Sequence, residues 1–317
     1  MNQIINNPFP YSMDNKRYHT LNYYFKNKYH QKIAKIPLHA GFTCPNRDGK
    51  KGVGGCTFCS DMGSGDSIVA FGADLKIQYE LGLARMRHKW PDCIGFAYFQ
   101  SYTNTYADFE TIKNLYDPFF DDDNIQGVCV ATRADCLSEE TIQYFIEQSK
   151  KKETWIELGL QSVHEHTMEA CNRQHNTQIV FDMVNKFKNT PVKTCVHIMN
   201  SLPGESKADM IETARQVGKS GCDAIKIHML HIIEGTQMAK EYKESPFPLL
   251  SREEYVDVVV QQLELLPPEM IIERLTGDGM AKDLIAPEWT IKKTIVTNEI
   301  DKRMVEWDTY QGKNYRD

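Results

Sequence analysis

The stretch Cys44-Pro-Asn-Arg-Asp-Gly-Lys-Lys-Gly-Val-Gly-Gly-Cys56-Thr-Phe-Cys59 holds three of the nine cysteines in the chain. Cys56 and Cys59 form a Cys-x-x-Cys pair, and eleven residues separate this pair from Cys44. Three thiolates on one glycine-rich loop make an incomplete metal site. Because an iron–sulfur cluster held by three cysteines keeps one iron open, we expect the open position to bind a substrate or cofactor.

The residues around this stretch alternate between strand and helix patterns. Short apolar runs predict seven strands, at residues 35–38, 94–100, 127–131, 154–159, 193–199, 224–228 and 271–275. Their continuous apolar character is typical of parallel strands buried on both faces. Leu75, Tyr79, Leu83, Met86 and Trp90 form a helical stripe between two of them. The series of βα units predicts an α/β fold, a partial (β/α)6 TIM-like barrel.

Helix starts are marked by capping residues. Thr177 is a plausible N-cap, and Ser251 with Glu254 forms a capping box. In parallel barrels the chemistry lies in the loops that follow the strands. The three-cysteine stretch follows the first predicted strand, which places it on that face.

No internal repeat or linker divides the chain. We expect a barrel over residues 35–266, an N-terminal basic and aromatic segment at 1–34, and a C-terminal extension at 267–317 that caps the site.

The composition is that of a globular protein, with 41% hydrophobic and 25% charged residues. There is neither an apolar run of membrane-spanning length nor a signal-peptide pattern, so we expect a cytoplasmic protein without membrane contact. A reducing compartment favours thiols and metal ligation over disulfides.

The net charge of −6 argues against a general affinity for nucleic acid. Residues 15–47 nevertheless lack acidic side chains. Seven basic residues lie there among tyrosines and a phenylalanine: Lys16, Arg17, Lys26, Lys28, Lys32, Lys35 and Arg47. The segment is either an RNA-binding surface or a helix whose aromatic residues pack in the core.

The cysteine set argues against two other chemistries. A structural zinc site needs a fourth ligand, and no second Cys-x-x-Cys or His-x-x-x-His occurs. A redox pair would not need Cys44.

The sequence resembles the radical S-adenosylmethionine (SAM) enzymes, within them the YhcC/YtqA subgroup, which is related to the radical SAM domain of the Elongator catalytic subunit. The resemblance spans residues 7–312 and rests on the segments at 44–49, 98–105, 158–162 and 275–279. Three residues usually separate the first two cysteines in this superfamily; a longer gap is a feature of this subgroup.

The resemblance implies that Cys44, Cys56 and Cys59 bind a [4Fe–4S] cluster. SAM would chelate the fourth iron and be cleaved, after reduction by a donor such as flavodoxin or ferredoxin, to a 5′-deoxyadenosyl radical. The protein then has to hold the cofactor and exclude solvent. Arg47, Lys50 and Lys51 would offset cluster charge, and amides of residues 52–55 would donate to cluster sulfurs.

The same resemblance places SAM contacts at later strand ends. The amino group of SAM would contact the loop after the second strand, at Gln100, Ser101, Thr103 and Asn104. The ribose would contact the end of the fourth strand, at Gln161 and Ser162. The carboxylate would contact Arg173. Each of these has an alternative role in a turn or cap.

Several polar residues are candidates for substrate contact. Arg133 and Asp135 end the third strand and form either an ion pair or a substrate site. The other candidates are His197, His228, Arg274 and Asp278, although a buried histidine is more often a core residue. The six remaining cysteines lack cluster spacing, which indicates inert thiols.

Three hypotheses follow. The resemblance favours tRNA wobble-uridine modification, from 5-carboxymethylaminomethyl toward 5-aminomethyl uridine. The second is a radical SAM enzyme with a small-molecule or protein substrate, and the third is a non-catalytic zinc-binding module.

Overall fold

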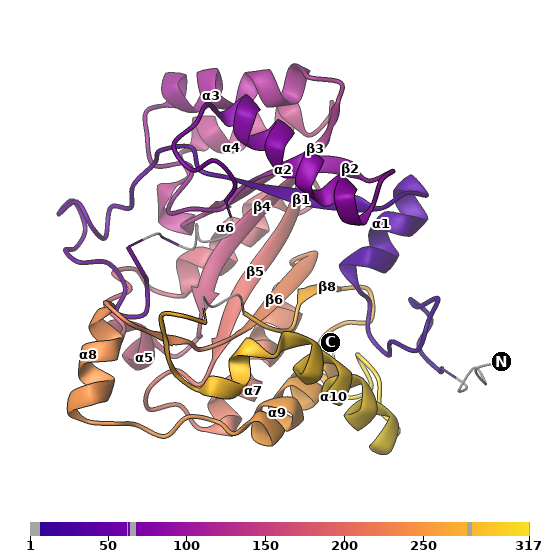
Figure 1. Ribbon diagram of the computed structural model, residues 1–317, viewed down its shortest axis with the longest axis vertical. Helices are drawn as coiled ribbons and strands as arrows, with labels where there is room; N and C mark the ends of the chain where they lie inside the picture. The colour runs from indigo at the N-terminus through magenta and orange to yellow at the C-terminus, as the bar shows by residue number, and fades with distance from the viewer. Residues whose placement is uncertain (1–6, 62, 64–67, 278–280, 317) are drawn as a thin grey trace. The chain divides into compact units, whose positions relative to one another are not determined.

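A computed structural model of the chain describes residues 7–61, 63, 68–277 and 281–316. All seven predicted strands are present (Figure 1). They are β1 (Ile33–Leu38), β2 (Ile94–Phe99), β3 (Ile125–Thr132), β4 (Glu153–Gln161), β5 (Lys193–Asn200), β6 (Ala224–Met229) and β8 (Ile271–Arg274). Two short strands, β7 (Ile232–Ile233) and β9 (Leu284–Ala286), form a separate antiparallel pair.

Helices follow most strands, as the βα pattern predicts. They are α1 (Leu21–Tyr29), α2 (Leu75–Lys89), α3 (Phe109–Asp121), α4 (Glu139–Gln148), α5 (Glu165–Ala170), α6 (Gln178–Phe187), α7 (Lys207–Lys219), α8 (Gln237–Glu244), α9 (Arg252–Glu264) and α10 (Lys293–Glu306). Two 3₁₀ turns, η1 (Ala134–Cys136) and η2 (Glu288–Ile291), complete the described elements. None of the helices in the described ranges is long and apolar enough to cross a membrane.

The seven strands form one sheet in the order β1-β2-β3-β4-β5-β6-β8. The pairs β1–β2, β2–β3, β3–β4 and β6–β8 are parallel, as their continuous apolar runs predict. Parallel strands bring their carboxyl ends to one edge, which places the cysteine stretch after β1 at the same edge as the loop after β2.

The chain divides into two compact units. The first comprises Met1–Tyr24, Leu160–Cys171 and Val196–Asp317, and the second Phe25–Gly159 and Asn172–Cys195. The second unit therefore holds β1 to β3, most of β4 and the whole cysteine stretch.

The core of the second unit contains a buried network of charged and polar side chains. Lys35 on β1 donates to Glu157 on β4 at 3.0 Å, and Tyr98 on β2 donates to the same carboxylate at 2.7 Å. Glu157 is fully buried. In a flat sheet β1 and β4 would lie about 14 Å apart, at about 4.8 Å per strand step. The contact shows that these strands curl, so that their inner side chains meet.

Two aromatic residues of α1, Phe25 and Tyr29, pack against the core. Phe25 is buried against Phe96 and Trp155, with ring centroids 5.0 and 6.3 Å away, and Tyr29 contacts Phe96. For these residues the core-packing alternative is therefore correct.

The first unit joins both ends of the chain. Ile272 of β8 donates to the carbonyl of His19 at 2.7 Å, and the His19 amide donates to the Gln311 side chain at 2.8 Å. Arg17 is buried and donates to the carbonyls of Met304 and Thr309. Its charge is used inside the fold and is not part of a basic surface.

The capping predictions had different outcomes. The box at Ser251 and Glu254 opens α9, with both reciprocal hydrogen bonds. Thr177 does precede α6, but its side chain makes no cap bond and its backbone is helical. Asn176 supplies the cap instead, since its side-chain oxygen accepts from the amide of Ile179 at 3.2 Å.

We expect Lys35→Met to destabilise the protein by about 3–5 kcal/mol, because it leaves the Glu157 carboxylate buried without its cation. The double variant Lys35→Met/Glu157→Leu should recover much of that loss. Chemical denaturation followed by fluorescence would measure both. Lys113→Gln, which breaks a half-exposed pair with Asp117, is the control and should change little. Equal effects of the two lysine variants would contradict the role of burial.

Candidate metal centre and cofactor site

A short hairpin closes the long gap between Cys44 and Cys56. Asp48 and Val53 form an antiparallel bridge, and the amide of Gly49 donates to Gly52 at 3.1 Å. The amide of Gly55 donates to the carbonyl of Asn46 at 2.8 Å. The gap is therefore folded back on itself, and Cys56 returns to the neighbourhood of Cys44.

The segment that carries Arg173 holds this hairpin in place. Asn46 donates to the carbonyl of Asn172 at 2.6 Å, and Asn172 donates to the carbonyls of Val53 and Gly55 at 3.2 and 2.8 Å. Asn172 has a φ of 54°, a left-handed conformation that asparagine tolerates better than most residues. Neither asparagine was among the predicted site residues, although Asn172 lies beside Arg173 in the sequence.

The three thiols lie close enough to influence one another. Burial raises the pKa of the Cys59 thiol, and Cys56 and Cys44 add to the rise through like-charge repulsion. Asn46 also donates to the Cys56 sulfur at 3.6 Å. A bound cationic centre would relieve this repulsion, so the donor set fits a thiolate-ligated cluster.

Within the described part of the chain, no three His, Cys, Asp or Glu side chains converge as ligands of a single metal ion.

Of the three predicted cationic neighbours, Arg47 faces the cysteines. Its guanidinium donates to the carbonyls of Cys59 and Ser60 at 3.0 and 2.7 Å, and it opposes the rise in the Cys59 pKa. Lys51 pairs with Asp135 at 2.5 Å, and Lys50 lies over the Tyr106 ring. The local positive charge at Cys59 therefore comes from Arg47.

The glycine amides do not all point to the cysteines. Those of Gly52 and Gly55 donate to carbonyls within the hairpin, to Pro45 and Asn46. The expectation that they donate to cluster sulfurs is wrong for these two residues, because closing the hairpin uses them.

The loop after β2 is buried and polar. Ser101, Thr103 and Asn104 are almost fully inaccessible. The Asn104 side chain donates to the carbonyls of Phe99, Ser101 and Ala131, which joins the ends of β2 and β3. The Ser101 hydroxyl and the Asn104 carbonyl oxygen have no hydrogen-bond partner among the described residues. These two atoms are suited to contact a bound polar group.

The amide of Gln100 continues the β1–β2 pairing, since it donates to Leu38 at 3.4 Å. Gln100 thus lies at the carboxyl edge of the sheet, next to the start of the cysteine stretch.

Arg173 is a buried cation beside the thiols. Its guanidinium donates to the carbonyl of Gly159 at 2.6 Å. Burial lowers its pKa, while Cys56 and Cys44 act in the opposite direction. The positive charge of Arg173 is thus held where an anionic ligand near the cysteines would meet it.

Arg133 and Asp135 form an ion pair. Nε and Nη2 of Arg133 each donate to the Asp135 carboxylate at 2.9 Å, and Nη1 donates to the carbonyl of Arg173 at 3.0 Å. Burial opposes ionisation of Asp135, but Arg133 outweighs it and lowers the pKa of that carboxyl group. The pair holds the Arg173 segment in place. Of the two alternatives for these residues, an ion pair or a substrate site, the structure shows the ion pair.

The end of β4 carries Gln161 and Ser162. Gln161 has a φ of 66°, so the strand ends in a left-handed turn. Ser162 is fully buried; its hydroxyl donates to Glu205 and accepts from the amide of His164 at 3.1 Å. These bonds lie within the first unit, and they stabilise the turn that follows β4.

The substrate candidates of the first unit gather on neighbouring strands. His197 and His228 have ring centroids 5.4 Å apart. Burial lowers the pKa of His228, and His197 and Arg274 add to this effect. Lys226 lies on the same strand and pairs with Glu273 at 3.5 Å. Asp278 lies outside the described residues.

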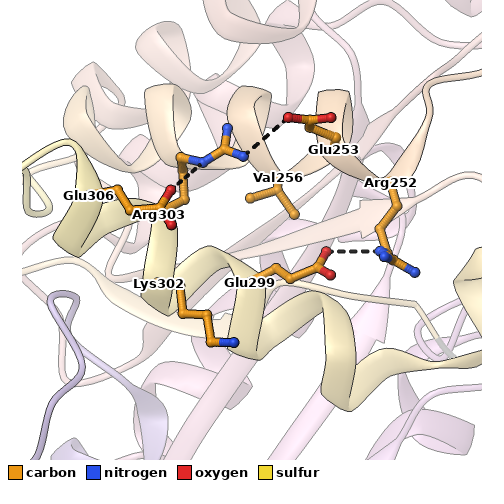
Figure 2. A pocket seen from close by; sticks show the side chains of 7 residues that line it. All are labelled: Arg252, Glu253, Val256, Glu299, Lys302, Arg303 and Glu306. Atoms are coloured by element: carbon orange, nitrogen blue, oxygen red, sulfur yellow. Dashed lines mark hydrogen bonds and ion pairs between the residues drawn. The ribbon is translucent and has the colours of Figure 1, made fainter.

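A cavity of about 280 Å³ lies elsewhere in the first unit, between α9 and α10 (Figure 2). Ion pairs between the two helices line it, Arg252 with Glu299 at 2.8 Å and Arg303 with Glu253 at 3.5 Å. The predicted site residues are not among its lining, so this cavity is distinct from the candidate cofactor site.

The network of Lys35, Tyr98 and Glu157 was missed by sequence reasoning. Lys35 and Glu157 are the charged residues in their apolar strand runs, and this is the signal that could have identified them.

Comparison with known proteins agrees with this geometry. Residues 52–217 match the Radical SAM superfamily, and residues 222–306 match the Radical_SAM C-terminal domain. The first match includes Cys56 and Cys59 and begins after Cys44. A solved structure of the archaeal Elp3 of Methanocaldococcus infernus, lacking residues 1–46, has a TM-score of 0.66 at 16% identity and covers 89% of this chain and 64% of that chain. This similarity shows the fold, the partial (β/α) barrel of radical SAM proteins.

The chain belongs to the radical SAM superfamily. The uncharacterized protein YtqA of Bacillus subtilis is 42% identical over 311 residues, which is 98% of this chain and 97% of that protein. The resemblance is therefore confirmed. A tRNA uridine(34) acetyltransferase of Methanocaldococcus infernus is 27% identical over 159 residues, 48% of this chain and 28% of that protein.

The protein is a radical SAM enzyme, and its cofactors are a [4Fe–4S] cluster and SAM. Bound together, they supply reductive cleavage of SAM to a radical that abstracts hydrogen. The residues described above fit this group: three cysteines whose thiolate forms repel one another, Arg47 beside Cys59, and the buried cation of Arg173.

We expect Cys44→Ala to abolish the cluster and SAM cleavage while the barrel stays folded, because Cys44 lies on a loop outside the sheet. Anaerobic reconstitution with iron analysis, absorbance and circular dichroism would measure this. Cys136→Ala is the matched control; burial raises the pKa of its thiol to about 12, so it should retain the cluster. A brown, active Cys44→Ala protein would exclude Cys44 as a ligand.

We expect Gly52→Ala to lower the iron content after reconstitution. A Cβ atom there would lie 2.2 Å from the Asn46 side-chain oxygen and 2.9 Å from Gln174, so the hairpin has to shift, at a cost of about 1–3 kcal/mol. Val53→Ala, at an exposed position of the same hairpin, should bind iron as the unchanged protein does. Equal iron content in all three proteins would contradict the role of the hairpin.

Proposed function

We propose that this radical SAM enzyme acts on the wobble uridine of tRNA. The proposed reaction takes a 5-carboxymethylaminomethyl group toward 5-aminomethyl. The observation that carries the tRNA proposal is the similarity to a tRNA uridine(34) acetyltransferase over 48% of this chain. The aligned part is 28% of that protein, so its acetyltransferase activity is not transferred.

In the proposed site Cys44, Cys56 and Cys59 hold the cluster. Ser101 and Asn104, with their unpartnered oxygens, and Gln100 and Thr103 beside them contact the amino end of SAM. Arg173 offers its charge to the carboxylate, since it lies in the electrostatic range of two of the cysteines. Arg133 and Asp135 act indirectly by holding the Arg173 segment.

The other strand ends have separate proposed roles. Gln161, at the left-handed end of β4, is the ribose contact, and Ser162 positions that turn. His197, His228 and Arg274 form a group of bases and cations that suits an anionic substrate group such as a carboxylate.

Two partners follow from the proposal. The first is the tRNA itself, and the second is a one-electron donor such as flavodoxin or ferredoxin. The cytoplasm supplies both, which is the location we propose.

Of the two alternatives, the non-catalytic zinc module is wrong, because the chain belongs to a family of radical SAM enzymes. A radical SAM reaction on a small molecule or a protein remains the competing function. It shares the cluster and SAM site and differs in the substrate group alone.

We expect tRNA from a strain that lacks this protein to accumulate 5-carboxymethylaminomethyl uridine and to lose the 5-aminomethyl form. Mass spectrometry of digested nucleosides measures both. Complementation with the unchanged gene should restore the profile, and complementation with the Cys44→Ala gene should not. An unaltered nucleoside profile in the deletion strain would refute the tRNA proposal and leave the competing substrates.

A further inference from the structure

The two cysteines of the Cys-x-x-Cys pair have different polar neighbours. Arg47 lies beside Cys59, where its guanidinium donates to the backbone carbonyl and opposes the rise that burial causes in the pKa of the thiol. Cys56 is contacted by the Asn46 side chain, whose amide nitrogen Nδ2 donates to the Cys56 sulfur at 3.6 Å. Arg47 therefore acts on the cysteines as a nearby charge, whereas Asn46 acts on one sulfur through one hydrogen bond.

The surroundings of the Asn46 amide determine its orientation. Nδ2 carries two hydrogens, and its two acceptors are the Cys56 sulfur and the carbonyl of Asn172, at 3.6 and 2.6 Å. A carbonyl oxygen and a thiolate can only accept, so the nitrogen end of the amide has to face them. The oxygen end faces Gly52, where an added Cβ atom would lie 2.2 Å from Oδ1. Turning the amide over would place its oxygen against two acceptors.

Asn46 is fully buried, with 0% of its surface exposed. Its Oδ1 atom has no hydrogen-bond partner among the described residues, and a buried polar atom without a partner costs about 1–3 kcal/mol. A side chain that only held the Asn172 carbonyl would need one donor hydrogen. Asn46 supplies a second hydrogen, and this one reaches the sulfur of a cysteine ligand.

A hydrogen bond to a ligand sulfur affects how readily an iron–sulfur cluster accepts an electron. Reduction adds negative charge, which the ligand sulfurs share. An N–H donor stabilises that charge more strongly in the reduced state than in the oxidised state. The effect is larger in a buried site, because water does not screen the bond. The expected consequence is a higher reduction potential.

We propose that Asn46 raises the reduction potential of the [4Fe–4S] cluster through its hydrogen bond to the Cys56 sulfur. Asn46 is thus a positioning residue that acts through a cluster ligand. The step that it favours is the transfer of one electron from a donor of the flavodoxin or ferredoxin class, in which no covalent bond forms or breaks and no proton moves. The inference depends on the three-cysteine cluster site and not on an RNA substrate.

The test is a potentiometric titration of the full-length reconstituted protein without SAM or RNA, with the reduced cluster followed by electron paramagnetic resonance. We expect Asn46→Ala to lower the equilibrium constant for reduction about tenfold, a shift of about 59 mV toward negative potential for one electron. The control Asn172→Gly removes the bonds to Val53 and Gly55, accepts the left-handed backbone, and leaves Asn46 beside Cys56. It should keep the potential of the unchanged protein.

A second measurement does not depend on whether Asn46→Ala binds a cluster. The unchanged protein is produced with asparagine labelled with nitrogen-15 in the side chain, then reconstituted and reduced. Pulsed electron paramagnetic resonance should detect a coupling between the cluster and the labelled nitrogen, transmitted through the hydrogen bond of Asn46. Protein made with unlabelled asparagine should lack this coupling.

Two outcomes of the titration overturn the proposal. One is an unchanged potential in Asn46→Ala, and the other is an equal shift in Asn172→Gly, because the position of the hairpin would then explain the effect. If Asn46→Ala binds no iron, the labelled protein decides: the coupling supports the proposal, and its absence overturns it. Since no RNA is present in either measurement, failure of the tRNA proposal leaves both results unaffected.

Discussion

The hydrogen bonds that fold residues 44–56 back on themselves determine where the three thiols lie. Without them, an eleven-residue gap rich in glycine would hold Cys44 and Cys56 at variable distances, at a large cost in conformational entropy when a cluster binds. The bridge between Asp48 and Val53 and the asparagine contacts from the Arg173 segment reduce that cost in advance. The long gap between Cys44 and Cys56 is therefore a small folded element.

The same contacts link the three-cysteine hairpin to the segment that carries Arg173. Arg133 holds the carbonyl of Arg173, Asn172 holds the hairpin, and Lys51 of the hairpin pairs with Asp135. A change at any of these positions would move both the thiols and the buried guanidinium. The proposed cysteine ligands and the proposed carboxylate contact therefore depend on one connected set of polar bonds.

The second unit contains a buried charge that is satisfied within the fold. Glu157 is fully enclosed and accepts hydrogen bonds from Lys35 and Tyr98, an arrangement that fixes which inner side chains of the curled strands meet.

The strands and the three-cysteine stretch could be predicted from sequence because both depend on local patterns: apolar runs in a series, and cysteines at fixed spacing in one loop. Even the capping box at Ser251 is local. The roles of Arg133, Asn172 and Lys35 could not be predicted, because each depends on a partner from a distant segment. Thr177 shows the same limit on a small scale, since a neighbouring asparagine competed for the cap. Residue type and spacing specify which chemistry is present; the packing of distant segments decides which of these groups face one another and which remain available to a ligand.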